Sequence, residues 1–171
     1  TGGVKSTVFH PMMIQGRSLD YANVVRVWRG TADVDGNRES DWAFLRLDKA
    51  LGYKYGTMAI VDEDTSADLS LAGYSHDVGN GETAGAHVGC VIYERLRDGM
   101  FKHNCEGNEG SSGGAIFAIS TVNGHRRGRI VGINTAHSIG PDLIAQFDDR
   151  NFNLGIRSSN FIQTYREILA Q

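Results

Sequence analysis

The sequence predicts an all-β protein that ends in one α-helix. Its 22 glycines against two prolines are typical of a chain with many turns and few long helices. Its apolar stretches are only a few residues long, as expected for strands between turns. The segment from Asn160 to Gln171 departs from this pattern, because its apolar residues recur at helical spacing.

Composition argues against two classes of partner. The formal net charge of −3 and the sequence pI near 6.0 argue against a nucleic-acid binder, which needs clustered Lys and Arg. The apolar stretches are also far shorter than the roughly 20 residues that span a bilayer. We therefore expect neither a nucleic-acid nor a membrane partner. At 171 residues the chain is long enough for one domain or two small ones.

The N-terminal part of the chain predicts a β-hairpin. Val4–Phe9 and Tyr21–Trp28 have the mixed alternation of strands, and Gln15–Ser18 is a turn-rich link between them. The next segment, Asp33–Ser40, has carboxylates at alternate positions, as a calcium loop does. Its glycine is fourth instead of sixth and no glutamate follows at the expected distance, so a solvated hairpin tip is the better interpretation.

A second informative stretch reads D-W-A-F-L-R-L and begins at Asp41. Ala43, Leu45 and Leu47 fall on one face of a predicted strand, and the carboxylate of Asp41 stands at its start. A carboxylate that enters a buried strand needs a hydrogen-bond partner, and a histidine imidazole is the partner that catalysis would use. The alternative is that Asp41 satisfies backbone donors at a turn.

The segment from Asn104 to Phe117 reads N-C-E-G-N-E-G-S-S-G-G-A-I-F. Ser112 lies among glycines directly before an apolar run, as a nucleophile does on a tight turn at the start of a strand. Glycines permit such a turn and let a substrate approach the main chain, and the N–H groups of Gly110 and Ser112 are spaced to bind one oxyanion. These residues predict acyl transfer. The alternative is a flexible loop rich in Gly and Ser.

The two cysteines, Cys90 and Cys105, are too few for a metal framework, and we expect no metal or other cofactor. They either close a disulfide around a loop of about 15 residues, worth about 3 kcal/mol, in an oxidising compartment, or remain free thiols in a cytosolic protein. Residues Thr1 to Thr7 lack the basic start and apolar middle of a signal peptide, so we expect any such peptide upstream.

The C-terminal segment predicts a helix from Asn160 to Gln171. Asn160 is the expected N-cap, with Gln163 three residues later. The apolar stripe of this helix consists of Phe161, Ile162, Tyr165, Ile168 and Leu169.

These segments together resemble the chymotrypsin-like (trypsin-fold) serine proteases, whose triad follows the chain order His, Asp, Ser. D-W-A-F-L-R-L is similar to their aspartate segment and G-S-S-G-G to their serine segment. Gly73–Asp77 and His103–Cys105 resemble segments of the bacterial, glutamyl-endopeptidase-like branch, and Gly132–Asn134 resembles the strand that walls the primary specificity pocket. The resemblance runs from about residue 4 to the C-terminus.

The resemblance implies two antiparallel β-barrels of the chymotrypsin type, the first of them incomplete, and a C-terminal α-helix. Residues 1–52 would form the C-terminal part of the first barrel and residues 53–157 the second barrel, which carries the nucleophile. Residues 158–171 would form the helix, and the three parts together one protease domain.

The resemblance also implies a serine endopeptidase that hydrolyses a peptide or protein substrate through an acyl-enzyme. Ser112 would be the nucleophile, Asp41 would orient a histidine, and Gly110 with Ser112 would form the oxyanion hole. A disulfide between Cys90 and Cys105 is implied, and with it a secreted or periplasmic protein. The implied specificity pocket comprises Glu106, Asn134, Thr135 and His137. Glu106 stands at the position that is acidic in trypsin-like enzymes, which would suit Lys or Arg; the alternative is that Glu106, directly after Cys105 in a turn, is exposed.

The chain departs from the family at the catalytic histidine, which should precede Asp41. Only His10 does so, and it lacks the small residues that family members place before their base. We therefore expect the histidine upstream of Thr1, on a missing or separate N-terminal fragment that completes the first barrel. This chain alone is then expected to be inactive, since a serine without a base is a poor nucleophile. The alternatives are a non-catalytic relative that binds a partner through the cleft and an esterase with the same triad.

Two further positions depart from relatives. Ser111 replaces the aspartate that, in digestive trypsin-like enzymes, pairs with an N-terminus released by zymogen cleavage, so activation by that route is not expected. Asn134 stands where the glutamate-selective enzymes have a histidine, which argues against a preference for glutamate. His103 is expected to pack beside Cys105 and not to act as the base.

Overall fold

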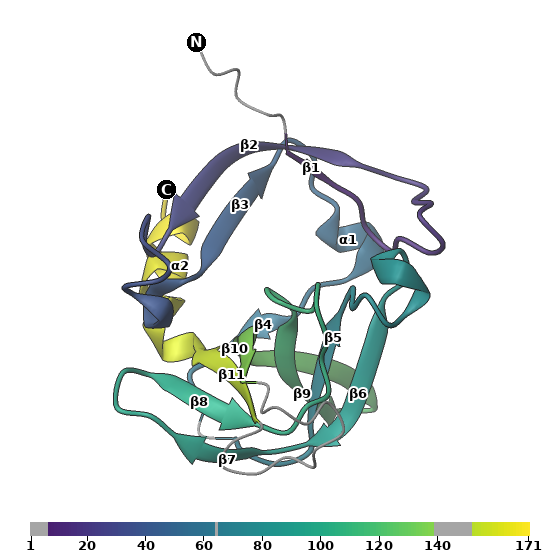
Figure 1. The fold of residues 1–171 in the computed structure, drawn as a ribbon. Helices are drawn as coiled ribbons and strands as arrows, with labels where there is room; N and C mark the ends of the chain where they lie inside the picture. The colour runs from purple at the N-terminus through teal and green to yellow at the C-terminus, as the bar shows by residue number, and fades with distance from the viewer. Residues whose placement is uncertain (1–6, 64, 139–151) are drawn as a thin grey trace.

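The computed structural model describes residues 7–63, 65–138 and 152–171. Within these ranges the strands form two separate sheets, and one helix of eight residues lies at the C-terminus (Figure 1). The prediction of a β fold that ends in a helix is therefore confirmed. The boundaries predicted at residues 52 and 157 remain predictions.

The first sheet has three strands, β1 (Val8–Phe9), β2 (Ala22–Arg29) and β3 (Ala43–Leu47), in the order β1-β2-β3. β1 pairs with β2 and β2 with β3, both antiparallel, so the hairpin predicted from the first two apolar segments is confirmed. The first three residues of the segment Val4–Phe9 lie outside the described residues.

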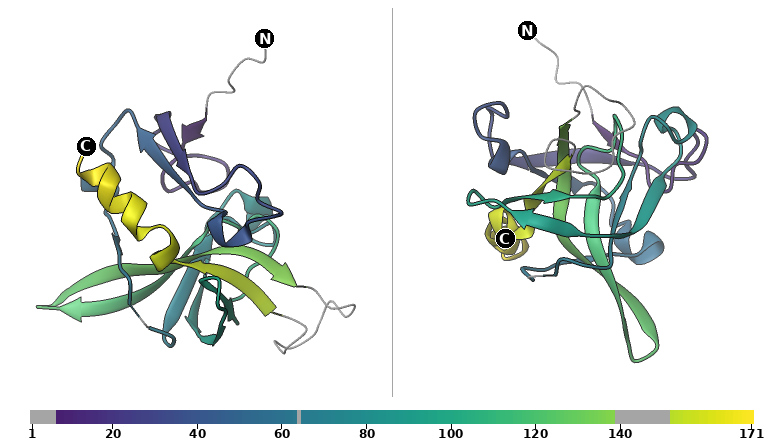
Figure 2. Two further views of the ribbon diagram at one scale, coloured as in Figure 1. Left: turned by 90° about the vertical axis from the view of Figure 1, so that its left-hand side faces the viewer. Right: turned by 60° about the horizontal axis from the view of Figure 1, so that its bottom comes forward.

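The second sheet is the larger one, with eight strands in the order β6-β5-β9-β10-β11-β8-β7 and β4 paired with β10. In chain order the strands are β4 (Ala59–Ile60), β5 (Leu69–Gly73), β6 (Gly85–Cys90), β7 (Ile92–Arg95), β8 (Met100–His103), β9 (Ala115–Val122), β10 (His125–Ser138) and β11 (Phe152–Arg157). The sheet is curled, and the β9–β10 hairpin projects from it (Figure 2).

A disulfide joins β6, at one edge of this curled sheet, to the residues after β8, which is next to the other edge. Cys90 is the last residue of β6 and Cys105 follows β8, and their sulfurs are bonded with a Cα–Cα distance of 4.9 Å. Both cysteines are fully buried in one cluster with apolar side chains of the central strands. The disulfide alternative is therefore correct and the free-thiol alternative is wrong. The apolar members of the cluster include Leu69, Leu71, Phe101, Ile116, Ala118 and Val131.

Hydrogen bonds within the loop stabilise the connection between β2 and β3. In the segment 33–40 the Asp33 carboxylate accepts a hydrogen bond from the Gly36 amide at 3.1 Å, and a 3₁₀ turn, η1 (Arg38–Ser40), follows. This arrangement fits the solvated hairpin tip between β2 and β3. A second 3₁₀ turn, η2 (Gly79–Gly81), lies between β5 and β6.

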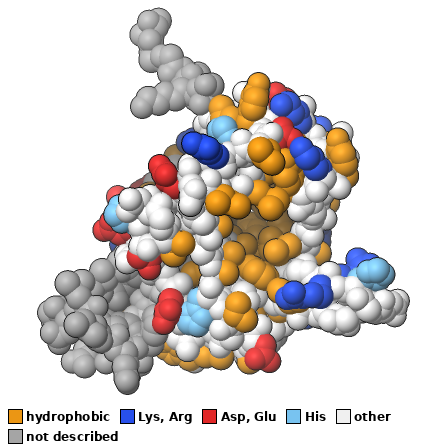
Figure 3. All heavy atoms as spheres, turned by 90° about the vertical axis from the view of Figure 1, so that its right-hand side faces the viewer, with side chains coloured by type: hydrophobic (Ala, Val, Ile, Leu, Met, Phe, Trp, Pro, Cys, Tyr) orange, Lys and Arg blue, Asp and Glu red, His pale blue; other side chains and the backbone are white. Residues whose placement is uncertain are grey.

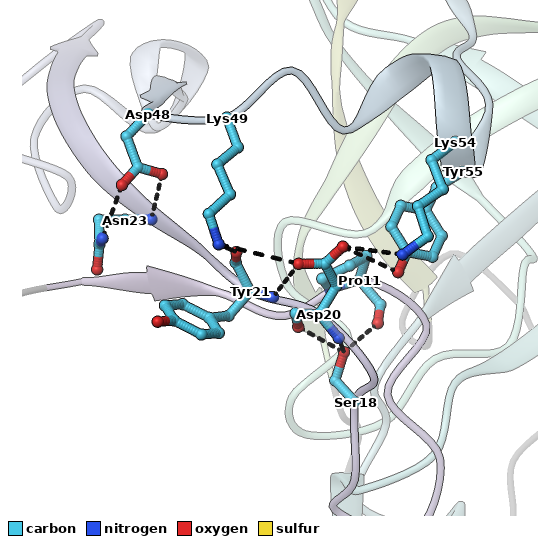
Figure 4. A network of polar contacts seen from close by, with 9 residues as sticks. All are labelled: Pro11, Ser18, Asp20, Tyr21, Asn23, Asp48, Lys49, Lys54 and Tyr55. Atoms are coloured by element: carbon cyan, nitrogen blue, oxygen red, sulfur yellow. Dashed lines mark hydrogen bonds and ion pairs between the residues drawn. The ribbon is translucent and has the colours of Figure 1, made fainter.

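A polar network ties the first sheet to the short helix α1 (Gly52–Tyr55) (Figure 4). The Asp20 carboxylate accepts a hydrogen bond from Lys54 Nζ at 3.0 Å, and Lys49 Nζ lies 4.0 Å from its other oxygen. The hydrogen bond from Lys54 is the main reason that the pKa of Asp20 is lowered. Asn23 and Asp48 add a pair of hydrogen bonds between β2 and the residue after β3.

The C-terminal helix α2 (Ile162–Leu169) packs against the first sheet and follows a 3₁₀ turn, η3 (Ser158–Asn160). Phe161, at its start, is buried, and its ring lies 6.2 Å from that of Trp42 and 5.9 Å from that of Phe44. The prediction that Asn160 is the N-cap is wrong. Its side-chain amide instead donates to the backbone carbonyls of Glu39 and Asp98, two distant loops.

The opposite face of the first sheet is uncovered. Phe44 is half-buried on the helix side, whereas Leu45, its neighbour in β3, is 47% exposed. Val27 pairs with Leu45 across the sheet and is 41% exposed, and Val25 is 61% exposed. The expectation that Ala43 and Leu45 lie on a buried face is therefore wrong for the described residues, because no element covers that face. Figure 3 shows apolar side chains around a hollow on the side of the molecule away from α2.

Candidate active site

The serine turn, Asn108–Ser112, is closed by backbone hydrogen bonds and contacts the loop after β5. The Ser111 amide donates to the Asn108 carbonyl at 3.0 Å and the Gly114 amide to the Ser111 carbonyl at 2.9 Å. Gly110 has φ +90°, and a Cβ atom there would lie 2.6 Å from the Tyr74 carbonyl oxygen. A glycine is therefore required at this position both for its backbone angle and for its close contact.

The turn exposes the two amides that were predicted to bind an oxyanion. Among the described residues, the backbone N–H groups of Gly110 and Ser112 have no hydrogen-bond acceptor. The Ser111 amide between them is bonded within the turn. The Ser112 side chain is exposed, and its hydroxyl donates to the carbonyl of Thr135 at 3.0 Å.

A bulge in β10 connects Ser112 with Asp41. In the pairing of β10 with β11, Asn134 is opposite Gly155 and Ala136 is opposite Leu154, which leaves Thr135 as the extra residue. Its hydroxyl donates to Asp41 Oδ2 at 3.2 Å, while its carbonyl accepts from Ser112. Thr135 was predicted only as part of a specificity pocket, and no sequence signal indicated that it joins these two residues.

Asp41 and Ser112 line the same cavity, of about 500 Å³, between the two sheets. Its other lining residues come from the end of β2, the β2–β3 loop, β3, β10 and the serine turn, and include Arg29, Trp42, Ala43, Asn134 and Thr135. A second cavity, of about 320 Å³, is also lined by Ser112, together with Gly110, Tyr74 and Gly113 among others. Ser112 therefore lines two hollows, and Asp41 lines one of them.

No histidine completes a triad within the described residues. No described imidazole is hydrogen-bonded to Asp41 or to Ser112. His10 lies at the end of β1, where its ring is 6.4 Å from that of Tyr21. The backbone of His137 belongs to β10, and its side chain lies outside the described ones.

Glu106 lies apart from Ser112. It lines a third cavity, of about 340 Å³, together with His87, Asp77, Ser75 and Ser111, and Ser112 is absent from that lining. Its carboxylate is 80% exposed, 3.9 Å from the His87 ring, and its backbone amide donates to His87 Nδ1 at 2.7 Å. The structure thus does not bring Glu106, Asn134 and Thr135 together around one hollow. Within the described part of the chain, no group of three or more His, Cys, Asp or Glu side chains is placed to bind a metal ion.

A buried polar chain lies directly behind the serine turn. His103, fully buried in β8, accepts a hydrogen bond from the Cys105 amide at Nδ1 (3.2 Å), so its proton is on Nε2, which lies 3.1 Å from Asn134 Oδ1. The Asn134 amide donates to Ser111 Oγ at 3.0 Å, and Ser111 Oγ donates to the Asn108 carbonyl at 2.7 Å. Burial lowers the pKa of His103 to about 4, opposed only in part by its hydrogen bonds with Asn134 and the Leu154 backbone. Sequence reasoning placed His103 beside Cys105 but missed this chain.

Solved structures of serine proteases are similar to the chain over nearly its whole length. A Glu endopeptidase in complex with MPD has a TM-score of 0.70 at 18% identity, and the alignment covers 97% of this chain and 73% of that one. The chain has the chymotrypsin-like serine protease fold. The protease Anisep from Arthrobacter nicotinovorans has a TM-score of 0.69 at 16% identity, covering 97% and 75%. The thermostable serine protease AL20 from an extremophilic microorganism has 0.66 at 20% identity, covering 94% and 74%.

The predicted fold class and the resemblance to chymotrypsin-like proteases are therefore confirmed at the level of the fold. No protein-family model and no curated protein matches the chain. Among its described residues, none of the helices has the length and apolar character to cross a membrane.

Proposed function

We propose that this polypeptide is the nucleophile-bearing part of a serine endopeptidase. Ser112 is the nucleophile, Asp41 orients and stabilises an imidazole, and the amides of Gly110 and Ser112 bind the oxyanion. The observation that carries the proposal is Thr135, whose carbonyl accepts from Ser112 and whose hydroxyl donates to Asp41 at the edge of one cavity. This pair of hydrogen bonds joins the two residues, although Asp41 precedes a strand of the first sheet and Ser112 precedes a strand of the second.

The reaction begins with attack of Ser112 Oγ on the carbonyl carbon of the scissile peptide bond. The imidazole takes the hydroxyl proton, and the negative charge that forms on the carbonyl oxygen is bound by the two free amides. Collapse of the tetrahedral intermediate breaks the C–N bond, and the imidazole returns the proton to the leaving amine. Water then attacks the acyl-enzyme by the same route and releases the acid product.

We propose that the imidazole comes from a polypeptide segment outside residues 1–171. Ala43 lines the cavity that contains Asp41 and Ser112, and Leu45 and Val27 continue the same sheet face. That face is apolar and uncovered, and within the described residues β3 pairs only with β2, so its outer edge has free backbone groups. A segment that adds a strand to β3 and covers this face would end beside Asp41.

A mass measurement tests the proposal. The full natural gene product should be treated with a fluorophosphonate probe and its intact mass compared with those of Ser112→Ala and Asp41→Asn variants. We expect one adduct on the natural protein, none on Ser112→Ala, and a labelling rate at least 100-fold lower for Asp41→Asn, because the imidazole loses its orientation. An adduct that persists in Ser112→Ala, or a folded natural protein that is never labelled, contradicts the proposal.

One observation favours a non-catalytic relative as the second candidate. The Ser112 hydroxyl donates to the Thr135 carbonyl, and none of the described imidazoles is bonded to it, as expected for a protein that uses the cleft only to bind a partner. The same labelling experiment separates the candidates, since a binding protein yields no adduct.

The substrate preference and the location of the protein belong to the same proposal. A preference for Lys or Arg before the cleaved bond remains a prediction from Glu106, tested by digestion of a peptide library in which no enrichment of basic residues would exclude it. A secreted or periplasmic location is supported by the Cys90–Cys105 disulfide, because such bonds persist in oxidising compartments. Recovery of the natural protein from the reducing cytosol with two titratable thiols would contradict that location.

A further inference from the structure

The serine turn needs a partner that fixes its conformation. Its two outward amides, those of Gly110 and Ser112, have no acceptor among the described residues, so the amides themselves do not stabilise the turn. Position 111 carries a neutral serine that is 5% exposed, and a neutral serine forms no ion pair. Hydrogen bonds with neutral groups are therefore the polar contacts that hold this side chain.

The only side-chain partner of Ser111 in the described structure is Asn134. The Asn134 amide donates to Ser111 Oγ at 3.0 Å, which leaves the serine hydroxyl proton to bond the Asn108 carbonyl at 2.7 Å and close the turn. Asn134 is itself 4% exposed, so its amide has no alternative partner in water.

His103 fixes which way the Asn134 amide points. Its Nε2–H donates to Asn134 Oδ1 at 3.1 Å, and its Nδ1 is occupied by the Cys105 amide, so the ring has one tautomer. With its oxygen bound to the histidine, the amide must present its N–H₂ group to Ser111. The direction of every hydrogen bond from Cys105 to Asn108 therefore follows from its neighbours.

We propose that His103 and Asn134 are positioning residues that hold the Asn108–Ser112 turn in its oxyanion-binding conformation by neutral hydrogen bonds. The inference rests on the proposed function for its purpose, and it names the residues that preform the same site. The turn is formed whenever the second sheet is folded, so no activating cleavage is required to form it.

Amide hydrogen exchange tests the positioning role without a substrate, a probe or a catalytic histidine. The amides of Ser111 and Gly114, which are bonded within the turn, report its local opening. In Asn134→Leu we expect both to exchange at least about tenfold faster than in the natural chain, since the hydrogen bond to Ser111 is lost and His103 loses its bond to residue 134. The matched control is Asn153→Leu, because Asn153 is also 4% exposed in a neighbouring strand and its amide donates to the Cys105 carbonyl. This control should leave the two exchange rates unchanged after correction for global stability.

A second pair of variants separates positioning from packing. Both His103→Gln and His103→Leu remove the imidazole Nδ1 that accepts from the Cys105 amide, but only glutamine has a side-chain N–H that can donate to Asn134. We expect His103→Leu to accelerate exchange at Ser111 and Gly114 and His103→Gln to restore the natural rates. Equal rates in the two His103 variants, or the same acceleration in Asn134→Leu and Asn153→Leu, would overturn the proposal.

If Asn134→Leu does not fold, Ser111→Ala removes the same hydrogen bond with a smaller change, and the same acceleration at Gly114 is expected. Unchanged exchange at Gly114 in Ser111→Ala would also overturn the proposal. Because no labelling of Ser112 is involved, failure of this experiment and failure of the proposed endopeptidase activity are distinguishable.

Discussion

Burial of His103 makes the stability of the fold depend on pH in a predictable window. The pKa of this imidazole falls from 6.5 in a solvated chain to about 4 in the folded protein, because its charged form would be buried. Between these values the unfolded chain binds a proton that the folded chain does not. The contribution of His103 to stability is therefore complete above pH 6.5, falls as the pH is lowered towards 4, and is constant below that pH. At about 1.36 kcal/mol for each pH unit between the two pKa values, this contribution amounts to about 3 kcal/mol.

Urea unfolding at a series of pH values from 8 to 3.5 measures this effect, with the natural chain compared against His103→Gln. Subtraction of the two profiles removes the contribution of the carboxylates, which both proteins share. We expect the difference in unfolding free energy to change by about 3 kcal/mol between pH 7 and pH 4. His125→Gln, at an exposed site on the β9–β10 hairpin, should keep the natural profile. Parallel profiles for the natural chain and His103→Gln would refute the reasoning.

Three further predictions concern stability. Gly110→Ala should cost more than Gly124→Ala, by at least about 1 kcal/mol in thermal unfolding, because both have positive φ but only at Gly110 would a Cβ meet a carbonyl; equal costs would contradict this. Phe161→Ala should cost about 3 to 5 kcal/mol in urea unfolding, since the ring packs α2 against Trp42 and Phe44, and a cost under about 1 kcal/mol would show that this packing is not needed. A double Cys90→Ala, Cys105→Ala variant should lose about 3 kcal/mol, and an unchanged melting curve would argue against the stabilising role of the disulfide.

Features of the fold and of the site that depend on residues adjacent in the chain could be predicted from the sequence. The tight turn around Ser112 follows from the glycines that surround it, and the hairpin from β1 to β2 follows from two alternating segments with turn residues between them. The all-β class with one C-terminal helix follows from the same local periodicities. In each case a few adjacent side chains determine the backbone conformation.

Features that depend on strand register and on the bulge in β10 could not be predicted. Thr135 reaches both Ser112 and Asp41 only because it is the unpaired residue of that bulge. Likewise, the Asn134 amide meets His103 only because β8, β11 and β10 are adjacent in the sheet. No local pattern records either arrangement.

The prediction for Asn160 failed for a related reason. Its sequence position is that of an N-cap, but its amide binds carbonyls of two loops that are distant in the chain. Tertiary contacts thus replaced the local capping bond. The predicted burial of β3 failed for the same reason. Alternating apolar residues indicate which side chains share a face, but they do not indicate which element covers that face.

The central claim is that Ser112 is an activated nucleophile in the natural protein. The most direct test is the fluorophosphonate-labelled mass of the full natural gene product, with Ser112→Ala measured beside it. We predict a single adduct that is lost in Ser112→Ala. A folded natural protein without an adduct would contradict the claim and leave the cleft as a binding site.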